Sequence, residues 1–409
     1  MVSLNLKGLT QDAIFSRRFA AAVLLASGAL AWFFLLSVYF VDLFVQVTAN
    51  PFWVTIGQVL FIGTGILSAI LGSLISDKID RRRFLWSWIA LGVISTALLA
   101  LFQGILFSVL SSILLGLSLG LGLPSSLAFL ADFTAVEERG RTAGTSILIT
   151  FIMAFLAIAI ANILHSTLLV IVLLLIVVRS TSFLSFVLEK SETKRVEYKS
   201  RLPKPDYKEL SFYLFPWIMF VIASVIASNL IPTTEELQWA VSTGTVIRYA
   251  FIALFGFIWG IVADHNGRKQ PIIIGLVVLG ISFALLSISI STFSVIAYLA
   301  LSGVAWGSFL TIYLVIPGDL SIPHHREKFY ALGTISPLII MFSLLLFLTA
   351  TPRISPIPFS QILMMIVILS IIPVWRAKET LLESKIQERK MKEYAERLGK
   401  SIQETGEKK

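Results

Sequence analysis

Arg248 is the residue whose type and position point most directly to chemistry. It lies nine residues into a predicted apolar helix over 239–262, about 14 Å along that helix at 1.5 Å per residue. A charge at such depth is costly to desolvate and indicates a functional site. No carboxylate falls near the centre of any predicted helix, and Asp42, Glu235 and Glu236 lie at predicted outer ends. An unpaired guanidinium suits a carboxylate or phosphate, so we expect Arg248 to bind an anionic substrate group.

Polar and aromatic side chains on the other predicted helices are further candidates for substrate contact. They are Trp32, Tyr39, Gln58, Asn162, Ser228, Asn229, Trp306 and Tyr313. Tryptophan and tyrosine also pack between helices or mark membrane interfaces, so an ordinary structural role is the alternative for each. Arg179 is a second charge within an apolar run, and it either has a function or extends its side chain to the membrane surface.

A repeat with a constant spacing of 187 residues runs through the chain. It pairs Asp77 with Asp264, Arg81 with Arg268, Gly116 with Gly303, Asp132 with Asp319 and Arg139 with Arg326. Because the register holds without an insertion, the two halves must have nearly identical element lengths. Such duplication is typical of membrane transporters.

The composition and the apolar runs predict a membrane protein. Hydrophobic residues make up 56% of the 409, charged residues only 14%, and the mean hydropathy is +0.88. Each span needs about 20 apolar residues as helix. We predict twelve, near 19–41, 54–75, 84–102, 105–128, 143–164, 167–188, 211–231, 239–262, 271–290, 293–317, 330–350 and 356–376. The predicted fold is an all-α integral membrane protein with two pseudo-symmetric six-helix bundles, over 1–188 and 211–377. A linker over 189–210 joins them, and a charged tail over 378–409 follows.

The distribution of basic residues predicts the orientation in the membrane. Of the 33 Lys and Arg residues, only Arg353 falls in a loop that the span count places outside, and Arg179 and Arg248 fall within spans. Basic loops stay in the cytoplasm. We therefore expect a multi-pass protein of the plasma membrane with both termini cytoplasmic. The net charge of +9 then reflects topology and not nucleic-acid binding.

Residues for metal binding or catalysis are missing from the sequence pattern. The chain has no cysteine, and its four histidines lack ligand spacing. An intramembrane enzyme would need paired acids, a histidine cluster or a nucleophile beside a base at a common depth. We expect no cofactor, no metal and no enzymatic activity.

Two loop types carry a family resemblance. The sequence reads GIVADHNGRK over 260–269 and SLISDKIDRR over 73–82, and DFTAVEERGRTAG over 132–144 has a counterpart at 319–326. These resemble the signature loops of the major facilitator superfamily. The first copy departs from the pattern, with Ser73 and Asp80 at the two glycine positions. The resemblance implies two bundles that rock about a site near the membrane midplane.

Charges in these loops are predicted to form a conformational gate. The candidates are Asp77, Arg81, Asp132, Arg139, Asp264, Arg268, Asp319 and Arg326. We expect Arg81 to pair with Asp132 and Arg268 with Asp319, while Asp77 and Asp264 could each cap a helix N-terminus of the opposite half. As exposed pairs, each would contribute about 1 kcal/mol.

The predicted function is transport of a small organic solute, with an anionic metabolite as the favoured class. Transport is either facilitative or secondary active, with protons as the candidate coupling ion, and the lipid bilayer and a small-molecule substrate are the expected partners of a monomer. One alternative is a proton-coupled drug exporter, but such members usually carry an arginine where this chain has Ser112. Another is a receptor of the same fold that has lost transport.

Overall fold

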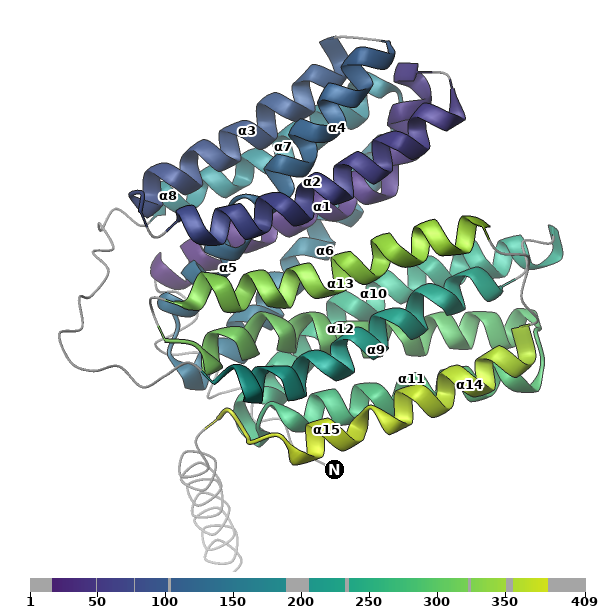
Figure 1. Ribbon diagram of the computed structural model, residues 1–409. Helices are drawn as coiled ribbons and strands as arrows, with labels where there is room; N and C mark the ends of the chain where they lie inside the picture. The colour runs from purple at the N-terminus through teal and green to yellow at the C-terminus, as the bar shows by residue number, and fades with distance from the viewer. Residues whose placement is uncertain are drawn as a thin grey trace, which may run out of the picture.

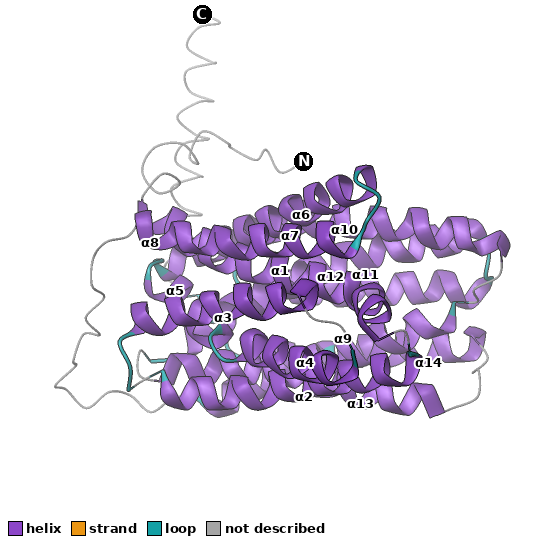
Figure 2. Cartoon of the chain, turned by 90° about the horizontal axis from the view of Figure 1, so that it is seen from above, coloured by secondary structure: helices purple, strands orange, loops and turns teal. Residues whose placement is uncertain are grey.

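The protein is described by a computed structural model covering residues 17–48, 50–76, 78–101, 104–188, 206–231, 235–322, 325–350 and 356–381. Side chains at 229, 230, 236, 345–350, 356 and 357 also lie outside the description. Helices and short loops account for all of the described part, as Figure 2 shows. The predicted all-α class is therefore confirmed.

The first half contains eight α-helices that form six long segments. They are α1 (Arg17–Thr48), α2 (Pro51–Ile75), α3 (Arg81–Leu101), α4 (Ile105–Gly120), α5 (Leu123–Asp132), α6 (Arg139–Ile163), α7 (Leu168–Ser180) and α8 (Leu184–Leu188). α4 and α5 continue each other across one membrane-length stretch, as do α7 and α8. Asn50 begins α2, because its side chain accepts a hydrogen bond from the Phe52 amide and a proline follows at the first helical position.

The second half repeats this pattern. Its helices are α9 (Tyr207–Leu230), α10 (Glu235–Asn266), α11 (Lys269–Ile288), α12 (Thr292–Leu320), α13 (Arg326–Ala350), α14 (Pro356–Leu369) and α15 (Ile371–Arg376). α9 begins within the predicted linker, because the Asp206 carboxylate accepts a hydrogen bond from the Glu209 amide at 3.0 Å. The rest of that linker, and the tail from 382 onward, lie outside the described residues.

Eleven segments of the described chain are long and apolar enough to cross a membrane. They match eleven of the twelve predicted spans. The twelfth, near 330–350, falls in α13, where the side chains of the last turns are not described. The helices are thus consistent with twelve crossings.

The two halves form two bundles that lie against each other (Figure 1). One apolar core fills the first bundle and continues into α10, α12 and α13 through Ile252, Leu314 and Tyr330, respectively. A second core lies within the second bundle. Trp306 and Leu310 of α12 pack against both cores, so α12 lies at the junction between the bundles.

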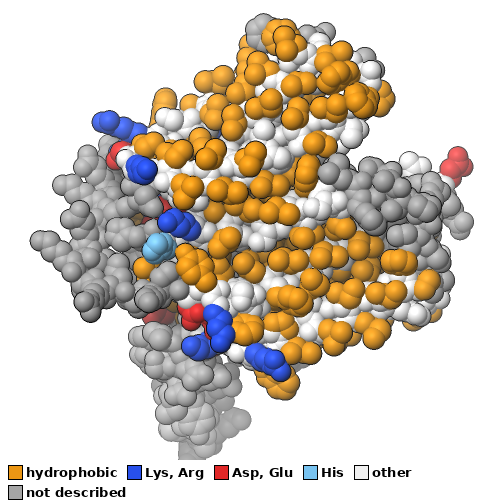
Figure 3. Space-filling view, viewed as in Figure 1, with side chains coloured by type: hydrophobic (Ala, Val, Ile, Leu, Met, Phe, Trp, Pro, Cys, Tyr) orange, Lys and Arg blue, Asp and Glu red, His pale blue; other side chains and the backbone are white. Residues whose placement is uncertain are grey.

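Charged side chains gather at one end of the molecule. On the face shown in Figure 3, most basic, acidic and histidine side chains lie along one edge, and hydrophobic side chains cover much of the remaining surface. This edge is the end at which α3, α6, α11 and α13 begin and α5, α10 and α12 end. We refer to it as the charged end.

Candidate substrate site and ion-pair network

An ion-pair network joins the two bundles at the charged end. Asp264, in the last turn of α10, accepts hydrogen bonds from the backbone amides of Gly140 and Arg141, both at 2.8 Å. These amides belong to the first turn of α6, where backbone donors lack helical partners and the helix dipole favours an anion. The prediction that Asp264 caps a helix of the opposite half is therefore confirmed. Asp77, its counterpart, lies outside the described residues.

Arg268 connects the two carboxylates of the second half. Its Nη1 lies 2.6 Å from Asp264 Oδ1, its Nε lies 3.1 Å from Asp319 Oδ2, and its Nη2 donates to the Val136 carbonyl at 2.5 Å. Burial lowers the pKa of this guanidinium, but the carboxylates of Asp319 and Asp264 outweigh burial and raise it overall. Arg268 therefore stays charged at any physiological pH.

Four ion pairs of the described residues cross between the bundles, and two of them are Arg141–Asp264 at 3.3 Å and Arg81–Glu327 at 3.8 Å. In the other two, Arg139 of α6 pairs with Asp319 of α12, and Arg326 of α13 pairs with Asp132 of α5. Asp132 also pairs with Arg81 of its own bundle. The predicted Arg81–Asp132 and Arg268–Asp319 pairs are thus both present. The network holds one end of the two bundles together.

The expectation that these pairs are exposed is wrong for most of them. The side chains of Asp264, Arg268 and Asp319 have 0% exposure and that of Arg139 has 3%, while Asp132 has 27%. The pairs are buried because the two bundles close over the loops. Removing one partner of a buried pair strands the other charge and costs about 3–5 kcal/mol, far more than an exposed pair contributes.

Helices α6 and α10 approach each other through their backbones next to this network. A Cβ added at Gly140 would lie 2.5 Å from the Gly260 carbonyl oxygen, and one added at Gly144 would lie 2.8 Å from that of Gly256. Real Cβ atoms do not approach backbone so closely. Glycine is therefore required where the two bundles meet at the charged end.

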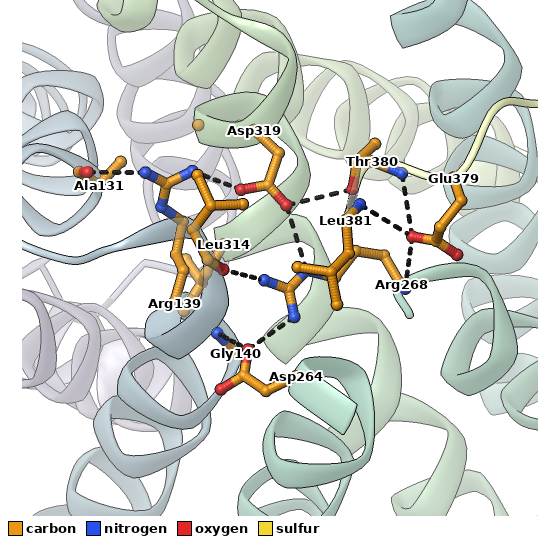
Figure 4. Close-up of polar contacts among 12 residues, drawn as sticks. Ala131, Arg139, Gly140, Asp264, Arg268, Leu314, Asp319, Glu379, Thr380 and Leu381 are labelled. Carbon is orange, nitrogen blue, oxygen red and sulfur yellow. Dashed lines mark hydrogen bonds and ion pairs between the residues drawn. The ribbon is translucent and has the colours of Figure 1, made fainter. Parts of the chain in front are cut away.

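The segment after α15 completes the network, and none of its residues was among the predicted gate residues. The Glu379 carboxylate accepts from the amides of Arg268 (2.7 Å) and Lys269 (3.2 Å), and the Thr380 hydroxyl donates to Asp319 Oδ2 at 3.1 Å (Figure 4). Lys269 Nζ also donates to the Trp375 carbonyl at 2.8 Å. We call residues 377–381 the C-terminal strap. The 187-residue spacing is a signal that could have identified it, because this register pairs Glu379 with Glu192 and Thr380 with Thr193, two residues outside the described part of the chain.

Arg248, about midway along α10, lies beside Trp306 of α12. The Arg248 guanidinium carbon is 5.7 Å from the centre of the Trp306 ring, within the range of a cation–π contact. Arg248 Nε and Trp306 Nε1 are both buried, and neither has a hydrogen-bond partner within the described chain. Both residues are half-buried as a whole. The pair offers two N–H donors and a positive charge to a ligand.

Arg179 and Trp32 occupy a different place, inside the first bundle. Arg179 is fully buried, with its guanidinium carbon 3.9 Å from the Trp88 ring centre and 5.0 Å from that of Trp32. Trp32 also donates to the Thr96 hydroxyl at 3.1 Å. Since Arg179 has no exposed surface, its side chain does not extend to the membrane surface. Trp32 lies with Arg179 and not with Arg248.

The remaining substrate-site candidates are spread over several helices. Tyr313 is buried, donates to the Tyr213 carbonyl and stacks on Trp217 with ring centres 4.8 Å apart. Tyr39 is buried in α1, and Gln58 is half-buried in α2. Asn162 and Ser228 are exposed near the ends of α6 and α9, and the side chain of Asn229 is not described. Trp306 is the candidate that the fold brings to Arg248.

The fold is shared with solved transporters of low sequence identity. The structure of FucP in the outward conformation aligns with a TM-score of 0.69 at 12% identity, covering 88% of this chain and 98% of that one. A bacterial homologue of the iron transporter ferroportin in its outward-facing state gives 0.66 at 16%, covering 89% and 99%. The human organic anion transporter MFSD10 (TETRAN) gives 0.64 at 14%, covering 88% and 99%.

Sequence comparison identifies the family. No curated protein sequence matches the chain. The model of the Major Facilitator Superfamily matches residues 19–336, which is most of the chain and includes all eight positions predicted as gate residues. The protein is therefore a multi-pass membrane transporter that belongs to the major facilitator superfamily.

Proposed function

We propose that the protein carries a small organic anion across the plasma membrane by opening in turn to the two sides. The observation that carries the proposal is the Arg248–Trp306 pair, whose buried Nε and Nε1 donors lack partners within the described chain. A guanidinium of this kind gains both a counter-ion and hydrogen bonds when a carboxylate or phosphate binds. The same fold serves a protein described as an organic anion transporter.

The ion-pair network acts in this proposal as the gate at the cytoplasmic end. Loops at the charged end are rich in Lys and Arg, which supports a cytoplasmic location for that end and for both termini. Because Arg139–Asp319, Arg326–Asp132 and the Asp264 cap all cross between bundles, they must break before this end opens. The arrangement described here corresponds to a carrier closed at its cytoplasmic end.

Facilitated diffusion by a monomer is the simplest mode for this site. A proton-coupled carrier normally needs a titratable group near the substrate. Along the sequences of α1, α6, α9, α10 and α12, carboxylates lie within a few turns of the helix ends: Asp42, Glu209, Glu235, Glu236, Asp264 and Asp319. Because these carboxylates lie away from the proposed site, proton coupling is the second candidate mode of transport.

Ligand binding to purified protein tests the proposal. Benzoate, succinate, phenyl phosphate and tetraphenylphosphonium would be compared for their effect on the thermal unfolding temperature, because a ligand of the folded state raises it by mass action. We expect an anion to raise the temperature in wild type and in Arg376→Gln, an exposed control, and not in Arg248→Gln. Uptake of the best anion into liposomes should follow the same pattern.

Two outcomes would contradict the proposal. Anion binding unchanged in Arg248→Gln would remove Arg248 from the site. Stabilisation by tetraphenylphosphonium and by no anion would favour a drug exporter.

A further inference from the structure

We infer that the transported anion carries a single charge on a flat aromatic body, and that Trp306, Tyr249 and Phe34 select for that body. The inference rests on the proposed function, since it concerns the same site. The proposed function specifies only that the substrate is an anion, and this inference adds the shape of the substrate and the number of its charges. The argument has three parts: the rings around Arg248, the bundle junction that they occupy, and the number of charges available.

Aromatic rings surround the Arg248–Trp306 pair on the side of the second bundle. The Trp306 ring meets the Phe220 ring edge to face at 4.9 Å and the Trp217 ring at 5.9 Å, both from α9. These two rings are themselves buried and stacked on Phe309. Trp306 is thus held in a fixed orientation by its neighbours while part of its own surface stays uncovered.

A second group of rings lies across the bundle junction, and one of them, Tyr249, directly follows Arg248 in the chain. Tyr249 meets the Phe34 ring of α1 edge to face at 4.8 Å and the Phe151 ring of α6 at 6.1 Å. Phe34 and Phe151 are 5.0 Å apart. Because Phe34 and Phe151 belong to the first bundle and Tyr249 to the second, these rings connect the bundles. Phe34 and Tyr249 are half-buried and so have ring surface available to a ligand.

The arrangement provides one positive charge. Along the helices that supply these rings, every other basic residue lies near an end: Arg17 and Arg18 in α1, Arg139 and Arg141 in α6, Lys208 in α9 and His265 in α10. A second anionic group on the substrate would be desolvated without a partner, which is strongly unfavourable. The site therefore favours a monoanion.

These rings can bind an aromatic ligand both by burying its apolar surface and by making stacked or edge-to-face contacts with its ring. Offset and edge-to-face contacts between rings add to the hydrophobic gain of burying the same area, and a flat ligand can make them with several rings at once. For one such contact we expect about a three- to tenfold gain in affinity. An aliphatic monocarboxylate of similar size keeps the ion pair with Arg248 but loses this gain.

Affinities for four probe anions test the inference: benzoate, cyclohexanecarboxylate, hexanoate and phthalate. They would be measured by calorimetry on the purified full-length protein. We expect benzoate to bind about three- to tenfold more tightly than cyclohexanecarboxylate or hexanoate, and phthalate to bind more weakly than benzoate. In Trp306→Leu, the ratio of the affinity for benzoate to that for cyclohexanecarboxylate should fall to half of the wild-type ratio or less. Weak binding of all three monocarboxylates should persist.

Further variants separate the inference from the proposed function. Phe34→Leu provides an independent loss of one ring if Trp306→Leu does not fold, and Trp239→Leu, at a side chain with 63% exposure, is the matched control. Equal affinity for benzoate and hexanoate, both lost in Arg248→Gln, would overturn the aromatic selection and leave the anion site standing. Tighter binding of phthalate would overturn the single charge. Binding unaffected by Arg248→Gln would overturn both proposals.

Discussion

The two copies of the signature loop are equivalent in sequence register and different in structure. In the first copy, Asp80 precedes α3 and accepts a hydrogen bond from the Arg83 amide at 2.9 Å, so the helix is capped from within its own loop. In the second copy the residue in register with Asp80 is Gly267, and Arg268 at the start of α11 makes no side-chain cap. Glu379 of the C-terminal strap accepts from the amides there instead.

The difference shows how one substitution relocates a helix cap. Gly267 has a backbone φ angle of +98°, which residues other than glycine rarely adopt. A Cβ at this position would lie 2.5 Å from Glu379 Oε2. Glycine thus makes room for a carboxylate from 112 residues away. Within the described residues, the first copy is capped by its own loop, whereas the second is capped by the strap. The second copy is also the more buried, because Asp319 has no exposed side-chain surface and Asp132 has 27%.

Replacing Asp319 should have the largest effect. Asp319→Asn removes the carboxylate shared by Arg139 and Arg268, and we expect it to destabilise the closed charged end by about 3–5 kcal/mol. The chain has no cysteine, so a cysteine introduced at Ile147, which packs against Gly256 of the other bundle, reports opening by its rate of maleimide labelling. A labelling rate equal to that of the otherwise unchanged Ile147→Cys protein would contradict the gate.

Removing the remote cap should have the next largest effect. Glu379→Ala leaves the Arg268 and Lys269 amides without their carboxylate, and hydrogen bonds to a charged group contribute about 1.5–3 kcal/mol. We expect faster labelling at Ile147→Cys together with a lower unfolding temperature. If labelling stays slow while the temperature falls, the strap stabilises the fold without influencing the gate.

Asp132→Asn should have a smaller effect than Asp319→Asn. The Asp132 side chain is 27% exposed, although Arg81 and Arg326 are only 7% and 13% exposed, so the expected loss lies between the value of about 1 kcal/mol for an exposed pair and that of about 3 kcal/mol for a buried one. The same labelling assay compares the two variants directly. An effect as large as that of Asp319→Asn would show that exposure does not distinguish the two copies.

Removing the local cap should have the smallest effect on the gate. Asp80→Ala deletes the acceptor of the Arg83 amide and should lower the free energy of unfolding by about 1 kcal/mol, as for other N-caps. Because Asp80 contacts its own helix and not the second bundle, labelling at Ile147→Cys should not change. Increased labelling would mean that the first loop also holds the bundles together through its cap.

The sequence was sufficient for the membrane spans and for the loop ion pairs within each bundle, but not for the pairs Arg139–Asp319 and Arg326–Asp132 between the bundles. Hydropathy locates helices because a bilayer requires long apolar segments, and the 187-residue register pairs Arg268 with Asp319 once it pairs Arg81 with Asp132. The partners of Arg248 and Arg179 could not be predicted in the same way. Their helices are apolar on most sides, so the pattern does not tell which ring each guanidinium meets. The strap was predictable only from the repeat: the 187-residue register pairs Glu192 with Glu379 and Thr193 with Thr380, whereas a glutamate in a charged tail carries no signal of its own.

The glycine contacts between α6 and α10 constrain how this carrier can vary. Glycine is the smallest residue, so a replacement at Gly140, Gly144 or Gly260 can only push the two helices apart and never draw them closer. Random substitution at these positions therefore acts in one direction: it weakens the closed charged end and favours a form that is open there. Gly63, whose added Cβ would meet nothing within 4 Å, carries no such bias. Random substitution at these glycines therefore destabilises the form closed at the charged end before it affects the open form.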